Sequence, residues 1–322
     1  MSDTFFDFSG RDSPEQTIRK TWDELRERLK DGSFPYNDIP KALNTVFIKV
    51  LDNLITKNGG CAYLTITLDQ IFKEYCLLRG AKIHPSETKP DYERMLPKSE
   101  YIKDDNRFSP KGVEWLYIAL GKGNDRTAQE YAKKCAQFEC RSTKGDRFAV
   151  CYFLNNSRNI NVIDLTIADD LTFDQMNQSL EDSYQEIIHE VTREKLNELQ
   201  KKYGRINSQT SIFTLLLMRS EIAKSKHTLI TPDSHPEAIE NYIKWYVYTY
   251  AKMLSEQLFL PIDSANKGLL YAPFQCIAQY FSSLGYSGII YKSTVYDSGK
   301  NLVLFDKDLV KPTGPVEEYY IS

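Results

Sequence analysis

The sequence predicts an α+β protein, and three observations lead to this class. Apolar residues at helical spacing fill the first part of the chain. Short apolar runs with strand character dominate the middle, and a helix followed by a strand pair closes the chain. Between the two strand-rich parts lies a long stretch with helical periodicity. We therefore expect a mixed β core with helical additions.

The first part of the chain, residues 1–74, is predicted to be a helical segment. A helix is expected over residues 12–31, because Ser13 is a good N-cap and Gln16 stands where a capping box needs it. A second helix is expected over residues 40–57, where a glycine pair follows and ends it. The residues after it are ambiguous.

The middle part, residues 75–170, carries most of the predicted strands. Strands are expected at 75–83, 113–120, 147–154 and 161–167, the last two joined by a turn at 155–157. Four prolines predict a loop over 84–110, and a helix is expected at 125–138.

Residues 171–261 are predicted to be a large helical insertion, with helices at 181–203, 211–223 and 236–258. Its tyrosines are expected to pack a core. Residues 262–322 return to mixed structure, with a helix at 273–284 and strands at 288–292 and 301–305. The catalytic core is thus expected to be discontinuous, made of 75–170 and 262–322.

Composition narrows the classes of function. The net charge of −3 and pI of about 5.9 disfavour nucleic-acid binding, which needs concentrated Lys and Arg. Apolar runs such as Leu215 to Met218 are far too short to span a bilayer, and no signal peptide is recognisable. The six cysteines and four histidines show no metal-ligand spacing, so no metal site is expected. Isolated thiols indicate a reducing, cytoplasmic protein.

Generic catalytic motifs are missing from the chain: we find no P-loop, dinucleotide fingerprint, nucleophile elbow or zinc-protease motif. The glycines of the stretch 121–124 suggest a phosphate loop only superficially. As a turn before a helix capped by Asp125, this stretch needs no ligand.

Several segments nevertheless occur together in a recognisable order. They are CLLRGAKI at 76–83, NRFSPKGVEWLYIA at 106–119, TAQE at 127–130, GYSGIIYKS at 285–293 and NLVLF at 301–305. This order resembles the RES domain family, named for an Arg, a Glu and a Ser. The resemblance covers about 75–167 and 265–310. The chain departs from the family pattern in carrying Ser109 where Asn is commoner, and in the large insertion before the Ser segment.

The resemblance implies a fold like that of ADP-ribosyltransferase toxins and an enzyme that degrades NAD+, a hydrolase or phosphorylase that acts as a toxin or defence effector. NAD+ is then the substrate, and no cofactor is implied. The matched positions are Arg79, Arg107, Tyr117, Glu130 and Ser293.

These residue types suit the cleavage of the nicotinamide–ribose bond. Glu130 is the candidate for stabilising the oxocarbenium-like charge that develops on the ribose. Arg79 and Arg107 are candidates for gripping the pyrophosphate, because guanidinium groups bind phosphate oxygens well.

The remaining candidates would hold the nicotinamide side of the substrate. Tyr117 offers a ring for stacking on the nicotinamide. Ser293 would hydrogen-bond the amide or a ribose hydroxyl. Tyr291 alternates with Ser293 along the strand and shares its face.

Each of these residues alone also has an ordinary structural explanation. A Glu at a helix start complements the helix dipole, an Arg in a loop or strand pairs at the surface, a Tyr in an apolar run packs the core, and a Ser ends a strand. Only the joint match favours a site.

Two other functions stay open. The first is mono-ADP-ribosyl transfer to a protein, whose arginine-modifying enzymes carry Gln or Glu two residues before the catalytic Glu. Here that position is Ala128, which counts mildly against it. The second is a non-catalytic binding module. An antitoxin or other regulatory protein is an expected partner, and residues 171–261 could cover the site or build an oligomer interface.

Overall fold

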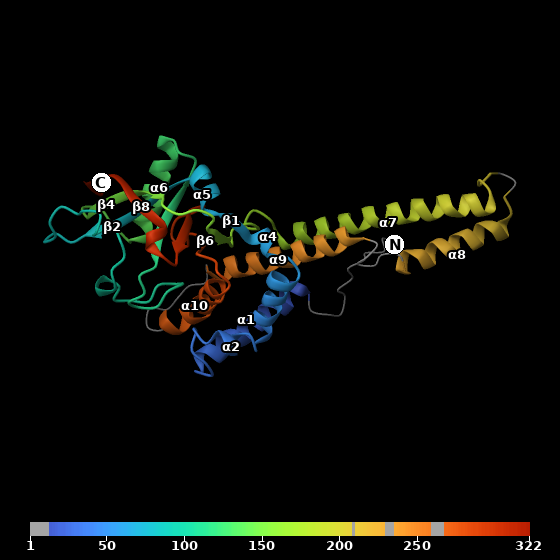
Figure 1. Ribbon diagram of the computed structural model, residues 1–322, viewed down its shortest axis with the longest axis horizontal. Helices are drawn as coiled ribbons and strands as arrows, with labels where there is room; N and C mark the ends of the chain where they lie inside the picture. Colours follow the sequence, from blue (N-terminus) through green and yellow to red (C-terminus); the bar gives the residue numbers. More distant parts are fainter. Residues whose placement is uncertain (1–12, 208–209, 229–234, 259–266) are drawn as a thin grey trace.

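The computed structural model describes residues 13–207, 210–228, 235–258 and 267–322. Within them the chain forms one eight-stranded mixed sheet surrounded by helices, which confirms the α+β class (Figure 1). The strands are β1 (Thr65–Thr67), β2 (Tyr75–Ile83), β3 (Leu116–Lys122), β4 (Arg147–Asn155), β5 (Asn161–Asp164), β6 (Gly288–Lys292), β7 (Lys300–Leu304) and β8 (Val310–Tyr320). Their order across the sheet is β1-β5-β6-β7-β3-β2-β4-β8, with β5 and β6 parallel and every other pair antiparallel.

The described helices follow the predicted pattern with several changes of boundary. They are α1 (Pro14–Lys30), α2 (Ile39–Ala42), α3 (Val46–Asp52), α4 (Cys61–Leu64), α5 (Leu68–Glu74), α6 (Arg126–Glu139), α7 (Phe173–Tyr203), α8 (Ile212–Thr228), α9 (Pro236–Leu258) and α10 (Lys267–Ser283). Short 3-10 turns lie at Ser99–Tyr101 and Lys307–Leu309.

The capping box predicted at Ser13 and Gln16 is present at the start of α1. The helix expected over 40–57 is interrupted, because the Thr45 hydroxyl accepts a hydrogen bond from the Ile48 amide and starts a new helix there. This second piece, α3, continues into a π-helical turn at Asn53–Lys57.

Strands β4 and β5 do not form a hairpin, although the turn between them predicted one. β4 pairs with β2 and β8, whereas β5 pairs with β1 and β6, so the two strands lie in different parts of the sheet. β6 and β7 do form the antiparallel pair that the sequence predicted.

Two strands escaped the sequence analysis. β1 is three residues long and pairs at the edge of the sheet with β5. β8 contains Pro312 and Pro315, and prolines in a segment argue against predicting a strand there. β8 is an edge strand, however, and an edge strand tolerates prolines because one side of its backbone has no neighbouring strand.

The N-terminal helices do not form a separate unit. Trp22 of α1 and Phe47 of α3 pack in the same apolar cluster as Tyr250 of α9, Phe274 of α10 and Val303 of β7. Trp22 lies 5.1 Å from Phe47 and 5.3 Å from Phe274, ring centre to ring centre. Helices α1 and α3 are therefore part of one wall of the core that supports the sheet.

Helices α7, α8 and α9 form an arm that extends away from the sheet (Figure 1). α9 lies along the part of α7 nearest the sheet, and α8 lies along its far part. At 31 residues and about 1.5 Å per residue, α7 is about 46 Å long. No helix among the described residues is long and apolar enough to cross a membrane.

Candidate functional site

The site begins where strands β2 and β3 separate. The two strands pair only from Tyr75 to Leu78 of β2. Beyond Leu78, β2 continues along β4, while the rest of β3 stays paired with β7. The sheet is thus split between Arg79 on one side and Tyr117 on the other, and the split opens into a cavity of about 380 Å³.

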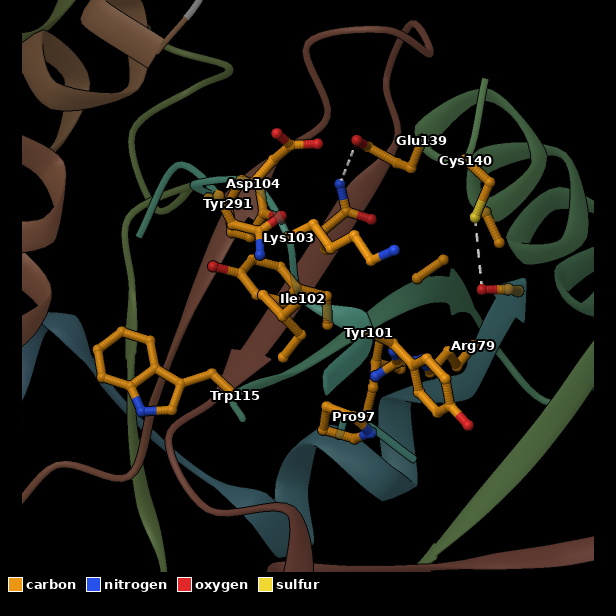
Figure 2. A pocket seen from close by; sticks show the side chains of 17 residues that line it. Arg79, Pro97, Tyr101, Ile102, Lys103, Asp104, Trp115, Glu139, Cys140 and Tyr291 are labelled. Atoms are coloured by element: carbon orange, nitrogen blue, oxygen red, sulfur yellow. Dashed lines mark hydrogen bonds between the residues drawn. The ribbon is translucent and has the colours of Figure 1, made fainter. Parts of the chain in front are cut away.

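Four parts of the chain line this cavity: the split strands, the loop before β3, the end of α6, and the β6–β7 pair. Its charged lining residues are Arg79, Lys103, Asp104 and Glu139, and its aromatic ones are Tyr101, Trp115, Tyr117 and Tyr291 (Figure 2). None of the described residues of the 171–261 insertion lines it. The arm leads away from the cavity and does not cover it.

Arg79 is the most unusual group in the cavity wall. Its Nη1 atom is out of contact with solvent and has no hydrogen-bond partner among the described residues. Burial lowers the pKa of Arg79 to about 10, against a smaller opposing effect of Cys140. The guanidinium therefore stays charged at neutral pH, although leaving one of its nitrogens buried without a partner is costly. Arg79 lines the cavity, so an anion bound there would supply the missing acceptor once the residues that cover Nη1 shift.

Glu139 supplies the carboxylate of the cavity. It is the last residue of α6, and its Oε1 accepts hydrogen bonds from Ser293 Oγ at 2.7 Å and from Asn301 Nδ2 at 2.6 Å. The dashed line that ends on Glu139 in Figure 2 marks the second of these bonds. Both donors bond the same oxygen, Oε1. No described residue donates a hydrogen bond to Oε2, so this oxygen is available to a ligand. A carboxylate at the C-terminal end of a helix opposes the helix dipole.

Ser293 and Asn301 hold Glu139 in place. The Ser293 hydroxyl accepts from the backbone amides of Val295 and Tyr296, which leaves its proton to be donated to Glu139. Asn301 is fully buried, and its Oδ1 lies 3.5 Å from the Cys135 thiol, which donates to it. That contact directs the amide NH₂ group toward the carboxylate.

Two tyrosines form the floor of the cavity. Tyr117 shares a 2.9 Å hydrogen bond with the buried Ser109 hydroxyl, and burial raises its pKa well above 10. Tyr291 is buried edge-on against Phe108, with ring centres 4.9 Å apart, and burial also raises its pKa. Both rings are thus neutral and fixed, as a surface for stacking requires.

Arg107 lies outside the cavity lining. Its guanidinium donates a hydrogen bond to the backbone carbonyl of Leu258, the last residue of α9, and lies 5.7 Å from the centre of the Tyr271 ring. A cation at a helix C-terminus is favourable, so Arg107 is held by the helix rather than left free for a ligand. It connects the loop before β3 to the base of the arm.

The structure does not bring Glu130 to the cavity. Its side chain is 56% exposed and lies 3.5 Å from Lys133, one turn along α6. Glu130 and Glu139 are nine residues apart, so at about 100° per residue they point to opposite sides of the helix. Since Glu139 faces the split in the sheet, Glu130 faces solvent.

Of the predicted site residues, the structure therefore gathers Arg79, Tyr117 and Tyr291 in the cavity wall. Ser293 does not line the cavity but donates a hydrogen bond to Glu139, which does. Arg107 and Glu130 do not line it. Sequence reasoning missed Glu139 and Asn301. The signal that could have indicated Glu139 is an acidic residue at the C-terminal end of a predicted helix, where the dipole disfavours it.

The glycine-rich stretch 121–124 has a structural role. A side chain on Gly121 would lie 2.0 Å from the carbonyl oxygen of Ala128. The amide of Gly123 donates to Glu74, and its carbonyl accepts from Cys76, so the loop is bonded to β2 and the residue before it. Asp125 caps α6 as expected.

No group of His, Cys, Asp and Glu side chains suited to a metal ion occurs in the described part of the chain. A scan against protein-family models finds no match, and searches of curated proteins and of solved structures find none either.

Proposed function

We propose that the protein cleaves the nicotinamide–ribose bond of NAD+ in the cavity between β2 and β3. The observation that carries the proposal is that one cavity is lined both by Arg79, whose Nη1 is buried and unpartnered among the described residues, and by an anchored carboxylate, Glu139. The resemblance to the RES family supports it, since Arg79, Tyr117 and Ser293 are matched positions. An ADP-ribosyltransferase-like fold belongs to the same proposal, as does a role as a toxin or defence effector.

In this proposal Arg79 binds the pyrophosphate, which is the most strongly anionic part of NAD+. Its Nη1 would gain the acceptor that it lacks in the free protein. Lys103, an exposed residue of the cavity lining, adds a second cation. Tyr117 and Trp115 offer ring faces for the bases.

Glu139 is proposed as the catalytic carboxylate. As the C–N bond breaks, its electron pair moves to the nicotinamide ring, which leaves as a neutral molecule. The ribose carbon becomes positively charged, and a fixed negative oxygen beside it stabilises that transition state. An oxygen of water or phosphate then bonds to the carbon, and when water attacks, the proton that it loses passes to the solvent. Glu139 takes over the role that the sequence analysis gave to Glu130.

Transfer of ADP-ribose to a protein has one observation in its favour. With Glu139 as the carboxylate, the residue two positions before it is Gln137, a residue type found there in transferases. On a helix, however, side chains two residues apart are separated by about 200° around the helix axis, so Gln137 and Glu139 lie on different sides of α6. Gln137 does not line the cavity. Cleavage without a protein acceptor therefore remains the preferred function.

Ser293 is proposed as a positioning residue, because it contacts Glu139 rather than the cavity. We expect Ser293→Ala to lower kcat for NAD+ about tenfold with little change in KM, since one anchor of the carboxylate is lost. Ser293→Thr keeps the hydroxyl and should restore most of the rate. Steady-state kinetics of the two variants measure this, and equal losses in both would contradict the positioning role.

The proposal is tested by incubating the full chain with NAD+ and separating the products by chromatography. Free nicotinamide in amounts that grow with time and enzyme concentration supports cleavage. NAD+ that stabilises the protein against heat but stays intact would instead support a non-catalytic binding module.

A further inference from the structure

The far end of the arm carries an apolar surface that the described chain leaves uncovered. The residues Leu215 to Met218 in the first turns of α8 are all apolar. Successive helix positions are about 100° apart, so four apolar residues in a row surround the helix. Met218 is buried, but Leu215 is 39% and Leu216 is 58% exposed.

Ile206, in the bend between α7 and α8, extends this surface and is 45% exposed. The bend and the start of α8 both lie at the end of the arm farthest from the sheet (Figure 1). A helix that is apolar on every side is normally found in a protein interior. Over this part of the arm α7 is the described element along which α8 packs, so its other sides are free of described residues, and an exposed apolar surface of this kind is typical of a contact site.

Basic residues outnumber acidic ones in the chain segments on either side of the exposed leucines. The stretch 198–222 holds Lys201, Lys202, Arg205 and Arg219 against Glu198 and Glu221, an excess of positive charge in a chain whose net charge is −3. Both acidic residues are already paired, Glu198 with Lys195 at 2.7 Å and Glu221 with Lys202 at 3.6 Å. The remaining basic residues of the stretch, Lys201, Arg205 and Arg219, have no ion-pair partner among the described residues.

We propose that the arm tip, defined as Ile206, Leu215, Leu216, Lys201, Arg205 and Arg219, docks an acidic amphipathic helix of a partner protein. Such a helix would place its apolar side on the leucines and its carboxylates beside the three cations. A third helix added to the α7–α8 pair makes a small bundle, the usual way for helices to bury apolar sides.

A second copy of the chain is a poorer occupant. In a symmetric dimer each surface meets its own copy, so Lys201, Arg205 and Arg219 would approach the same cations of the other subunit. Like charges brought together across an interface are destabilising. The proposal is independent of NAD+ cleavage and concerns binding alone.

The test uses two synthetic amphipathic peptides of about three heptads, alike in their leucines but with Glu in one and Lys in the other. Fluorescence anisotropy measures their binding to the full chain at low and moderate salt. The acidic peptide should bind, more weakly as salt increases, and the basic peptide should not.

Two variants and one control make the test specific. Leu215→Ser with Leu216→Ser should weaken binding of the acidic peptide about tenfold or more. Arg205→Glu with Arg219→Glu should transfer the preference to the basic peptide. Leu154→Ser removes a leucine of similar exposure (48%) on the sheet and should change nothing. Circular dichroism confirms that each variant is folded.

Three results would overturn the proposal. Equal binding of both peptides removes the charge argument. A dimer in light scattering that L215S with L216S abolishes makes a second copy the occupant. Flotation of the protein with phosphatidylserine vesicles, without binding of the acidic peptide, makes the surface a membrane contact.

Discussion

The Glu139→Gln variant is expected to lose NAD+ cleavage by a factor of about 10³, with little change in thermal stability. Gln keeps the size of the side chain and an oxygen that can accept from Ser293 and Asn301. It removes the negative charge that stabilises the oxocarbenium-like transition state, and losses of this kind are mostly losses in kcat. Initial rates of nicotinamide release from wild type and variant measure the effect.

The matched control is Glu130→Gln, the same substitution on the opposite side of the same helix. Because Glu130 is exposed and pairs only with Lys133 among the described residues, this variant should keep full activity. The opposite pattern, with Glu130→Gln inactive and Glu139→Gln active, would return the catalytic role to the residue that the family resemblance indicated.

The Arg79→Met variant is expected to raise KM for NAD+ by a factor of about 10 or more, without a loss of stability. The first effect follows from removal of a charge-assisted contact to the pyrophosphate. The second follows because the free protein leaves Nη1 buried and unpartnered, so an apolar side chain of similar length removes a desolvation cost. We expect the free energy of unfolding to stay the same or rise by about 1 kcal/mol.

Urea unfolding and steady-state kinetics measure the two effects on Arg79→Met, with the exposed Arg126→Met as control. The pKa of about 10 also predicts that KM of the wild type is constant between about pH 6 and 8, because Arg79 keeps its proton throughout. A clear loss of stability with an unchanged KM would show that Arg79 serves the fold rather than a ligand.

The sequence could predict the elements of the fold far better than their assembly. α1, α6, α9, β6 and β7 follow from caps and periodicity, which are local properties. The pairing of β5 with β6 joins residues more than 120 positions apart, and no local pattern indicates it. The prolines of β8 conceal a strand because only its edge position makes them acceptable.

The candidate site shows the same limit. The family pattern could indicate Arg79, Tyr117 and Ser293 because they lie in or beside strands, where the position in the sequence fixes the position along the strand. The choice between Glu130 and Glu139 depends on which side of α6 faces the split between β2 and β3, and that is a tertiary property. Asn301 was passed over because a buried amide in a strand carries no motif, although its contact with Glu139 completes the site.

The most direct test of NAD+ cleavage follows the full chain with NAD+ by proton and phosphorus NMR, with and without added phosphate. The proposal predicts nicotinamide released in equal amount with free ADP-ribose, or with its phosphorylated form when phosphate attacks, and release from Glu139→Gln that is slower by a factor of about 10³. NAD+ that remains intact with the wild-type protein, or ADP-ribose found attached to protein rather than free, would contradict it.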